Sequence, residues 1–108
     1  DAKKFLPQIK QEQFPAQTRA AEVYLDAGVR TMERGVVSAG RKANGENYFP
    51  KLELVRFTIP RRVYTQAHMD VIAESTARVY ERRNTIKGMK MIYEPKYLRF
   101  FQARFEKI

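Results

Sequence analysis

The sequence predicts an α+β fold in which helices cover one face of a mainly antiparallel sheet. Two segments, 16–27 and 66–83, have the spacing of apolar residues that is typical of amphipathic helices. Short runs rich in apolar and aromatic residues predict strands at 29–34, 52–59, 89–94 and 100–106. The resulting order of helix, strand, strand, helix, strand, strand fits helices packed against an antiparallel layer.

The 108 residues have the composition of one small globular domain or of a piece of a larger one. The absence of cysteine excludes disulfides and thiolate metal sites, and it is compatible with a reducing cytoplasm. A single histidine without a carboxylate cluster speaks against a metal site. The apolar runs are far shorter than a membrane span, so no membrane partner is expected.

The formal net charge of +9 suggests nucleic acid or another anionic surface as a partner. The basic residues, however, are spread along the chain in pairs, and no nucleic-acid recognition motif accompanies them. A basic nucleic-acid-binding module therefore stays a distant alternative. The start at Asp1 without methionine hints at a fragment, in which case acidic regions elsewhere would balance the charge.

The first residues show no sustained hydrophobic period. We expect a connector over 1–14, or a helix end with a loop, before a domain that spans 15–108. The step from Phe14 to Pro15 predicts extended backbone at Phe14 and the first position of a helix at Pro15. Gly28 suits a left-handed cap at the end of this helix.

The middle of the chain is predicted to hold two strands joined by a polar loop. The strand over 29–34 is expected either to end or bulge at Gly35 or to continue through 36–39, and the loop 40–50 contains an Asn-Gly turn signal. The second strand, 52–59, is ended by Pro60.

The last part of the chain begins with a capped helix. Thr65 has the residue type of an N-cap for the helix 66–83, and His68 in its first turn is expected to be structural rather than catalytic. The pattern then predicts a strand at 89–94, a turn at 95–98 and a final strand at 100–106.

Two arginines lie in or beside the predicted strands. Arg56 is the only cation in an otherwise largely apolar strand, where period-two alternation groups it with Leu52 and Leu54. Because burying an unpaired charge is costly, Arg56 either faces water on an edge strand or binds an anion such as a carboxylate. Arg34, which precedes Gly35, is either a solvated cation or a donor to a ligand oxygen. The pattern alone leaves the choice at Arg56 open and favours a solvated cation at Arg34.

Two adjacent phenylalanines near the end of the chain differ in their predicted faces. In an extended strand, Phe101 shares a core-like face with Ala103 and Phe105, whereas Phe100 lies on the polar face. An aromatic residue out of phase with the core is either a second packing surface or a wall for a flat ligand.

Three long blocks carry a resemblance to a known family. They read QFPAQTRAAEVYLDAGVRTMERG at 13–35, VRFTIPRRVYTQAHMD at 55–70 and YEPKYLRFFQARF at 93–105. In this order they resemble the C-terminal part of the β-eliminating pyridoxal-phosphate lyases, which comprise tyrosine phenol-lyases and tryptophan indole-lyases. The resemblance covers nearly the whole chain, from about Gln13 to Ile108.

Two positions resemble the tyrosine phenol-lyase branch of that family. Arg34, in the MERG segment, stands where tryptophan indole-lyases carry an aliphatic residue, and Phe100 with Phe101 stands where they carry His-Phe. Gln66 is instead similar to the tryptophan enzymes, which stay the nearest alternative.

The resemblance implies a fold of the aspartate-aminotransferase type, of which this chain matches most of the small C-terminal domain. It implies a homotetramer that uses pyridoxal 5′-phosphate and a monovalent cation such as K⁺ to convert L-tyrosine and water to phenol, pyruvate and ammonium. It also implies that Arg56 holds the substrate α-carboxylate, that Arg34 meets the phenol hydroxyl, and that Phe100 and Phe101 surround the substrate ring.

No lysine lies in a stretch that resembles the cofactor-binding segment of these enzymes. The Schiff-base lysine, the phosphate site and the cation ligands are therefore expected from the remainder of the same enzyme chain. We expect no cofactor-binding or metal-binding residue in these 108 residues and no activity from them alone.

Overall fold

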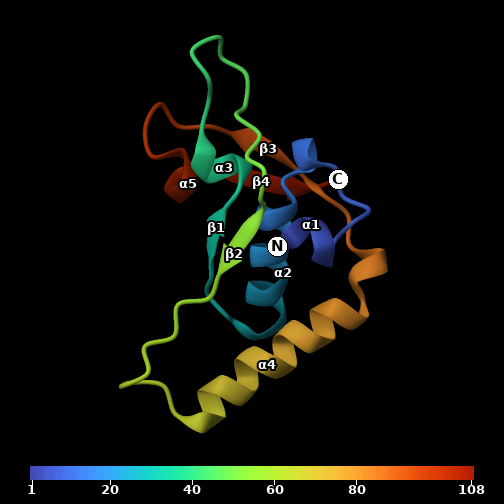
Figure 1. The fold of residues 1–108 in the computed structure, drawn as a ribbon, viewed down its shortest axis with the longest axis vertical. Helices are drawn as coiled ribbons and strands as arrows, with labels where there is room; N and C mark the ends of the chain where they lie inside the picture. The colour runs from blue at the N-terminus through green and yellow to red at the C-terminus, as the bar shows by residue number, and fades with distance from the viewer.

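The computed structural model describes all residues, Asp1–Ile108, as an elongated molecule of 47 × 31 × 24 Å (Figure 1). It contains two long helices, α2 (Pro15–Ala27) and α4 (Gln66–Glu81), and two separate two-stranded antiparallel sheets. Helices and antiparallel strands occur together, as an α+β fold requires. A single mainly antiparallel sheet is not formed, because two segments expected to extend it are helical.

The first sheet pairs β1 (Met32–Arg34) with β2 (Leu54–Arg56), and Met32 lies opposite Arg56. The predicted continuation of the first strand is wrong, because residues Val36–Ala39 form the short helix α3. The backbone N–H groups at the start of α3 donate to buried carboxylates, an arrangement that a continued strand would not offer.

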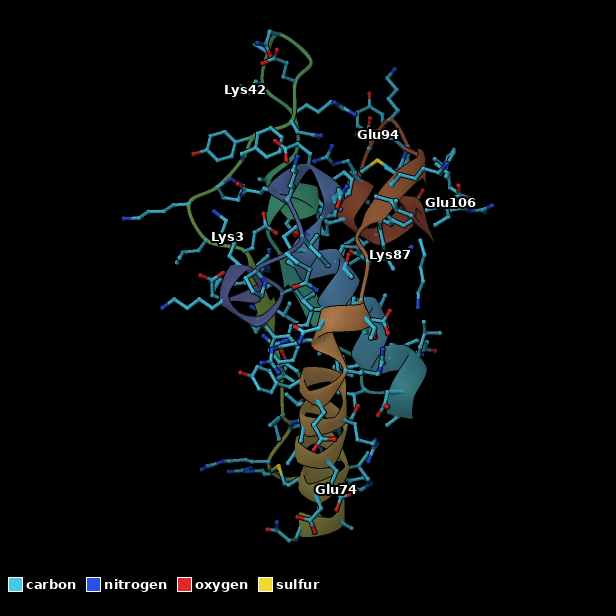
Figure 2. All side chains as sticks on the ribbon, turned by 90° about the vertical axis from the view of Figure 1, so that its right-hand side faces the viewer. Lys3, Lys42, Glu74, Lys87, Glu94 and Glu106 are labelled. Atoms are coloured by element: carbon cyan, nitrogen blue, oxygen red, sulfur yellow. The ribbon has the colours of Figure 1, made fainter.

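The predicted polar loop between these strands is confirmed. It turns at Gly45, whose φ of +87° suits glycine, and the backbone N–H of Lys42 donates to the carbonyl of Glu46 at 2.8 Å. Figure 2 shows Lys42 at the far tip of this loop, away from both long helices.

The second sheet pairs β3 (Met89–Tyr93) with β4 (Arg104–Lys107). The final strand is shorter than predicted, because residues Arg99–Gln102 form a helical turn, α5. The chain enters α5 through Leu98, whose backbone is left-handed with φ of 55°, so strand alternation does not apply before β4.

Helix α2 begins at Pro15 and is capped by Gly28 in the left-handed conformation, both as predicted. The expected extended backbone at Phe14 is wrong, because its φ is 55° and ψ 63°. The Phe14 ring is buried and meets Phe105 edge to face at 5.3 Å between centroids, so its packing outweighs the local preference of a residue before proline.

Helix α4 begins at the predicted cap. The backbone N–H of Thr65 donates to Nδ1 of His68 at 3.0 Å, and the His68 ring also lies 5.0 Å from the ring of Tyr64. The structural role predicted for His68 is therefore confirmed. A 3₁₀ turn, η2 (Arg83–Thr85), follows the helix. None of the helices is long and apolar enough to cross a membrane.

Residues 1–14 contain the helical turn α1 (Ala2–Phe5), a loop and the 3₁₀ turn η1 (Gln11–Gln13). Leu6 and Ile9 in this segment are buried. The segment therefore packs against the rest of the chain.

The core has two apolar clusters, and α2 lies between them. One cluster joins the N-terminal segment to both long helices, and it consists of Leu6, Ile9, Val23, Val29, Val79 and Ile86. The other joins the start of α2 to α3, and it consists of Phe14, Val36 and Val37, with Met91 and Phe105 packed against it. The sheet of β1 and β2 is thereby held against α2 with its other face outward (Figure 1).

Candidate functional site

The β1–β2 sheet carries the two arginines that the sequence singled out. Side chains alternate along a strand, and Met32 faces Arg56 while Arg34 faces Leu54 across the pair. Arg34 and Arg56 therefore lie on the same face of the sheet as diagonal neighbours, and backbone positions related in this way are typically about 7–8 Å apart. Both are exposed, so within this chain Arg56 faces outward rather than into the core.

The opposite face of β1 is fixed by a buried carboxylate. Glu33 is only 7% exposed, and its Oε1 accepts hydrogen bonds from the backbone N–H groups of Gly35 at 2.6 Å and Val37 at 3.2 Å. Its Oε2 accepts from the N–H of Ser38 at 2.9 Å and from the Ser38 hydroxyl at 2.6 Å. Because Glu33 is held inward, alternation directs Arg34 outward.

A second buried carboxylate, that of Glu53 directly before β2, is likewise held on the inward side of the sheet. Glu53 is fully buried, and it accepts from Gln11 Nε2 at 2.9 Å and from the backbone N–H groups of Val36 at 3.1 Å and Ala16 at 3.4 Å. Burial raises the pKa of Glu53; the Gln11 hydrogen bond opposes this rise, and the nearby charge of Glu33 adds to it. The sequence held a signal for this residue, because Glu53 is in phase with Val55 on the inward face of β2.

Arg56 has no strong acceptor inside the chain. Its Nη2 donates to the thioether sulfur of Met32 at 3.1 Å, and a thioether is a weak acceptor. The guanidinium borders a hollow of about 240 Å³ lined by Arg30, Thr31, Met32, Arg56, Thr58 and Tyr64. The arrangement leaves a planar donor group beside open space, which suits a carboxylate.

Arg30 is a site residue that the sequence reasoning missed. It lines the same hollow as Arg56, and it is exposed. The sequence offered one signal for Arg30, because the side chains of Arg30, Met32 and Arg34 would point to the same face of an extended chain. A second cation beside Arg56 strengthens the attraction of this face for an anion.

Phe100 and Phe101 lie on α5, with ring centroids 4.4 Å apart. Phe101 was expected on a core-like face, and this is wrong: Phe101 is 68% exposed and Phe100 39%, because both belong to a helical turn. Helix α5 packs against α3, which follows Arg34 directly after Gly35, so α5 lies near the end of β1 that carries Arg34 (Figure 1). The rings do not line the hollow that contains Arg56.

Three lysines of this chain, Lys87, Lys96 and Lys107, border open surface hollows. The lysines are exposed except for the half-buried Lys3, whose Nζ donates to the carbonyl of Lys51 at 2.8 Å. The structure also contains no group of three or more acidic or histidine side chains arranged around a metal ion. The lysine that would carry the cofactor implied by the resemblance stays an expectation for the remainder of the enzyme chain.

Comparison with known proteins decides the family. Residues 4–75 match the family model described as β-eliminating lyase. The chain belongs to the β-eliminating lyase family. This family is in general one of pyridoxal-phosphate enzymes.

Several curated relatives of the lyase chain carry the name tyrosine phenol-lyase. The chain is 72% identical over 107 residues to the enzyme of Nostoc punctiforme, 64% identical to that of Pasteurella multocida and 62% identical over 109 residues to that of Symbiobacterium thermophilum. These matches cover 98%, 98% and 100% of this chain and 23%, 23% and 24% of the relatives. The lyase chain thus spans about a quarter of the length of these relatives.

Proposed function

We propose that this lyase chain is the C-terminal, substrate-recognising part of a tyrosine phenol-lyase, in the small domain of an aspartate-aminotransferase-type fold. The complete enzyme would convert L-tyrosine and water to phenol, pyruvate and ammonium. The relatives named tyrosine phenol-lyase support the reaction class. The observation that carries the site is the shared outward face of Arg34 and Arg56 on the β1–β2 sheet.

Arg56 binds the α-carboxylate of the amino acid in this proposal. A guanidinium can donate two parallel hydrogen bonds to a carboxylate, and the Met32 thioether is easily displaced as a weak acceptor. Fixing the carboxylate orients the Cα–H bond for removal of its proton, and such positioning contributes several kcal/mol to catalysis. Arg30 supports the same carboxylate through its charge.

Arg34 acts at the other end of the substrate as the catalytic residue of this segment. Its guanidinium donates to the phenol oxygen and favours the tautomer in which the ring leaves as phenol. A site that satisfies a hydroxyl rejects rings that lack one, because its polar groups would then stay unpaired.

Phe100 and Phe101 form a wall against the substrate ring in this proposal. Their exposure in the chain leaves apolar surface available for an aromatic ligand, and the two neighbouring rings are tilted by 48° to each other. Contact with the ring also excludes water from the bond that breaks.

The remainder of the enzyme supplies what this segment lacks. Pyridoxal phosphate, when bound, provides the electron sink for proton removal at Cα. The lysine that carries it, its phosphate site and the K⁺ ligands would come from the other three quarters of the chain. We further propose a cytoplasmic homotetramer as the active form.

Two substitutions in the full-length enzyme test the proposed roles. Arg56→Ala is expected to weaken binding of every amino-acid substrate. Arg34→Ala is expected to lower kcat/KM for phenol release from tyrosine about 10²–10³-fold while elimination from S-methyl-L-cysteine continues. The measurements are steady-state phenol and pyruvate formation.

The matched control for both variants is Arg61→Ala. Arg61 is an exposed arginine in the turn between β2 and α4, outside the β1–β2 pair. Its removal is expected to leave both substrates unaffected. Normal tyrosine turnover by the Arg34→Ala enzyme would refute the role of Arg34, and release of indole from tryptophan instead of phenol from tyrosine would assign the chain to the tryptophan indole-lyases.

A further inference from the structure

Arg99 is a nearly buried cation that the substrate contacts proposed above do not use. It is 8% exposed, and its Nη2 and Nε donate to the carbonyls of Val36 at 2.6 Å and Val37 at 3.1 Å. Its Nη1 donates to Asn47 Oδ1 at 2.7 Å and to Glu94 Oε2 at 2.8 Å. All three nitrogens of the guanidinium are therefore engaged at once.

These contacts place α3 between two sets of charged groups. The N–H groups at its start donate to Glu33 and Glu53, and carbonyls of its own residues accept from Arg99. A helix of four residues has no stability of its own, because nucleation is too costly for so few hydrogen bonds. The position of α3 is thus set by these side chains together with the apolar packing of Val36 and Val37.

Helix α3 connects the two parts of the proposed ring site. Arg34 is joined to its start through Gly35, and Phe100 directly follows the arginine that holds its carbonyls. A displacement of α5 relative to α3 would therefore change the spacing between the Arg34 guanidinium and the two phenylalanine rings.

We propose that Arg99 is a positioning residue that sets Phe100 and Phe101 relative to Arg34 and thereby sets the preference for an aromatic substrate. This inference rests on the proposed function. The planar guanidinium is required, because a lysine at this position keeps the charge opposite Glu94 but cannot donate to both carbonyls in fixed directions.

The test compares full-length holoenzymes on two substrates, L-tyrosine and S-methyl-L-cysteine. Arg99→Lys is expected to lower kcat/KM for tyrosine about ten- to a hundredfold, mostly in kcat, because misplacing a ring-binding surface affects the reacting geometry. Elimination from S-methyl-L-cysteine, which has no ring, is expected to change by less than about twofold.

Two further variants keep the result interpretable. Arg41→Met removes the other arginine that donates to Glu94, at 2.9 Å, but Arg41 has no contact with the α3 carbonyls, so both substrates should be unaffected. Asn47→Ala removes one acceptor of Arg99 without altering a charge, and it should shift the tyrosine preference in the same direction by a smaller factor. If Arg99→Lys does not fold, Asn47→Ala alone tests the positioning role of Arg99.

The possible results distinguish a failure of the positioning role of Arg99 from a failure of the proposed function. Equal losses on both substrates in Arg99→Lys, or an unchanged substrate preference in both Arg99→Lys and Asn47→Ala, would overturn the positioning role while leaving the lyase activity in place. A wild-type enzyme that releases no phenol from tyrosine would instead remove the proposed function, and the inference with it.

Discussion

At the residue scale, two buried glutamates determine where the exposed arginines point. Glu33 and Glu53 occupy the inward positions of adjacent strands, where acidic side chains are normally unfavourable. They are tolerated because backbone N–H groups at the start of α3 and α2 donate to them. Each inward glutamate places its neighbour, Arg34 or Leu54, on the opposite face.

Gly35 is required because the buried carboxylates of Glu33 and Glu53 leave no room for a side chain at this position. A Cβ at this position would overlap the carboxylates of Glu53 and Glu33, although the backbone φ of −135° is accessible to any residue. Gly35→Ala is expected to lower the free energy of unfolding by about 2–4 kcal/mol, because a buried carboxylate must leave its donors. The melting temperature of the full-length protein measures the loss.

The control for this substitution is Gly45→Ala. Gly45 has open space around its Cα but a φ of +87°, so its replacement should cost only about 1–2 kcal/mol. If Gly35→Ala is no more destabilising than Gly45→Ala, the two carboxylates do not constrain Gly35.

Glu53 is expected to make stability fall as the pH rises. Its pKa in the folded chain lies above the ordinary value of 4.5, mainly because of burial, so the folded state holds the proton more tightly than the unfolded state. Stability is therefore fully present below pH 4.5 and is lost as the pH rises through the raised pKa. Glu53→Gln cannot titrate, so its melting temperature relative to wild type should increase from pH 4.5 toward neutrality.

Glu94→Gln serves as a control of opposite sign. The hydrogen bond from Arg99 lowers the pKa of Glu94, with burial opposing it and Arg41 adding to it. The stabilisation by ionised Glu94 is fully present above pH 4.5 and is lost at lower pH. The melting temperature of Glu94→Gln relative to wild type should therefore fall as the pH rises toward 4.5. The same trend in both variants would contradict the assignment for Glu53.

At the element scale, one carboxylate connects three elements. Glu22 of α2 is 3% exposed and pairs with Arg82 after α4 and with Lys107 of β4, each at 2.7 Å. Burial alone would raise the pKa of Glu22, but hydrogen bonds from Lys107 and Arg82 lower it overall. These two ion pairs thereby connect the β3–β4 sheet to the two long helices.

Glu22→Gln is expected to lower the free energy of unfolding by about 1–2 kcal/mol, because both cations lose a buried partner but are themselves half exposed. Urea unfolding of the full-length protein measures the change.

Glu106→Gln provides the matched control, since Glu106 pairs with Lys90 at 2.7 Å on the surface, where both side chains are at least half exposed. Figure 2 shows Glu106 at the edge of the second sheet. A loss of under about 0.5 kcal/mol is expected there, and equal effects would contradict the role of Glu22.

At the scale of the whole molecule, much apolar surface is uncovered. Tyr97, Val63 and Phe101 are each about 70% exposed, and Leu52 and Leu54 lie outward beside the arginine face. Large apolar side chains left exposed in this number are typical of surfaces that contact other protein or ligand. Since the chain spans about a quarter of its relatives, we expect the remaining chain and the substrate to cover it.

Residues 1–108 expressed alone are expected to be inactive. They contain the arginines proposed to recognise the substrate, and the lysine that carries the cofactor is expected outside them. The isolated chain should release no phenol from tyrosine and should not develop the visible absorbance of protein-bound pyridoxal phosphate, whereas the full-length protein should do both. Cofactor binding by the isolated chain would show that the lysine lies within it.

The sequence predicted the elements whose cause is local. Helix α2 with its proline start and glycine cap, the Thr65 cap of α4 and the turn at Gly45 all follow from nearby residues. The grouping of Arg56 with Leu54 also held, because β2 is a regular strand. The face of Phe101 was wrong, because the strand assumed there is a helical turn.

What the sequence alone determined is therefore the pair of long helices, the strand alternation and the family resemblance, since each depends on periodicity or on contiguous residues. Only the tertiary structure decided that residues 36–39 and 99–102 are helical, because the charged groups that hold them come from distant positions. Arg99 reaches Val37 across 62 residues, and Glu53 reaches Val36 across 17. A short helix whose termini depend on such partners has no local signal, because its own hydrogen bonds are too few to stabilise it.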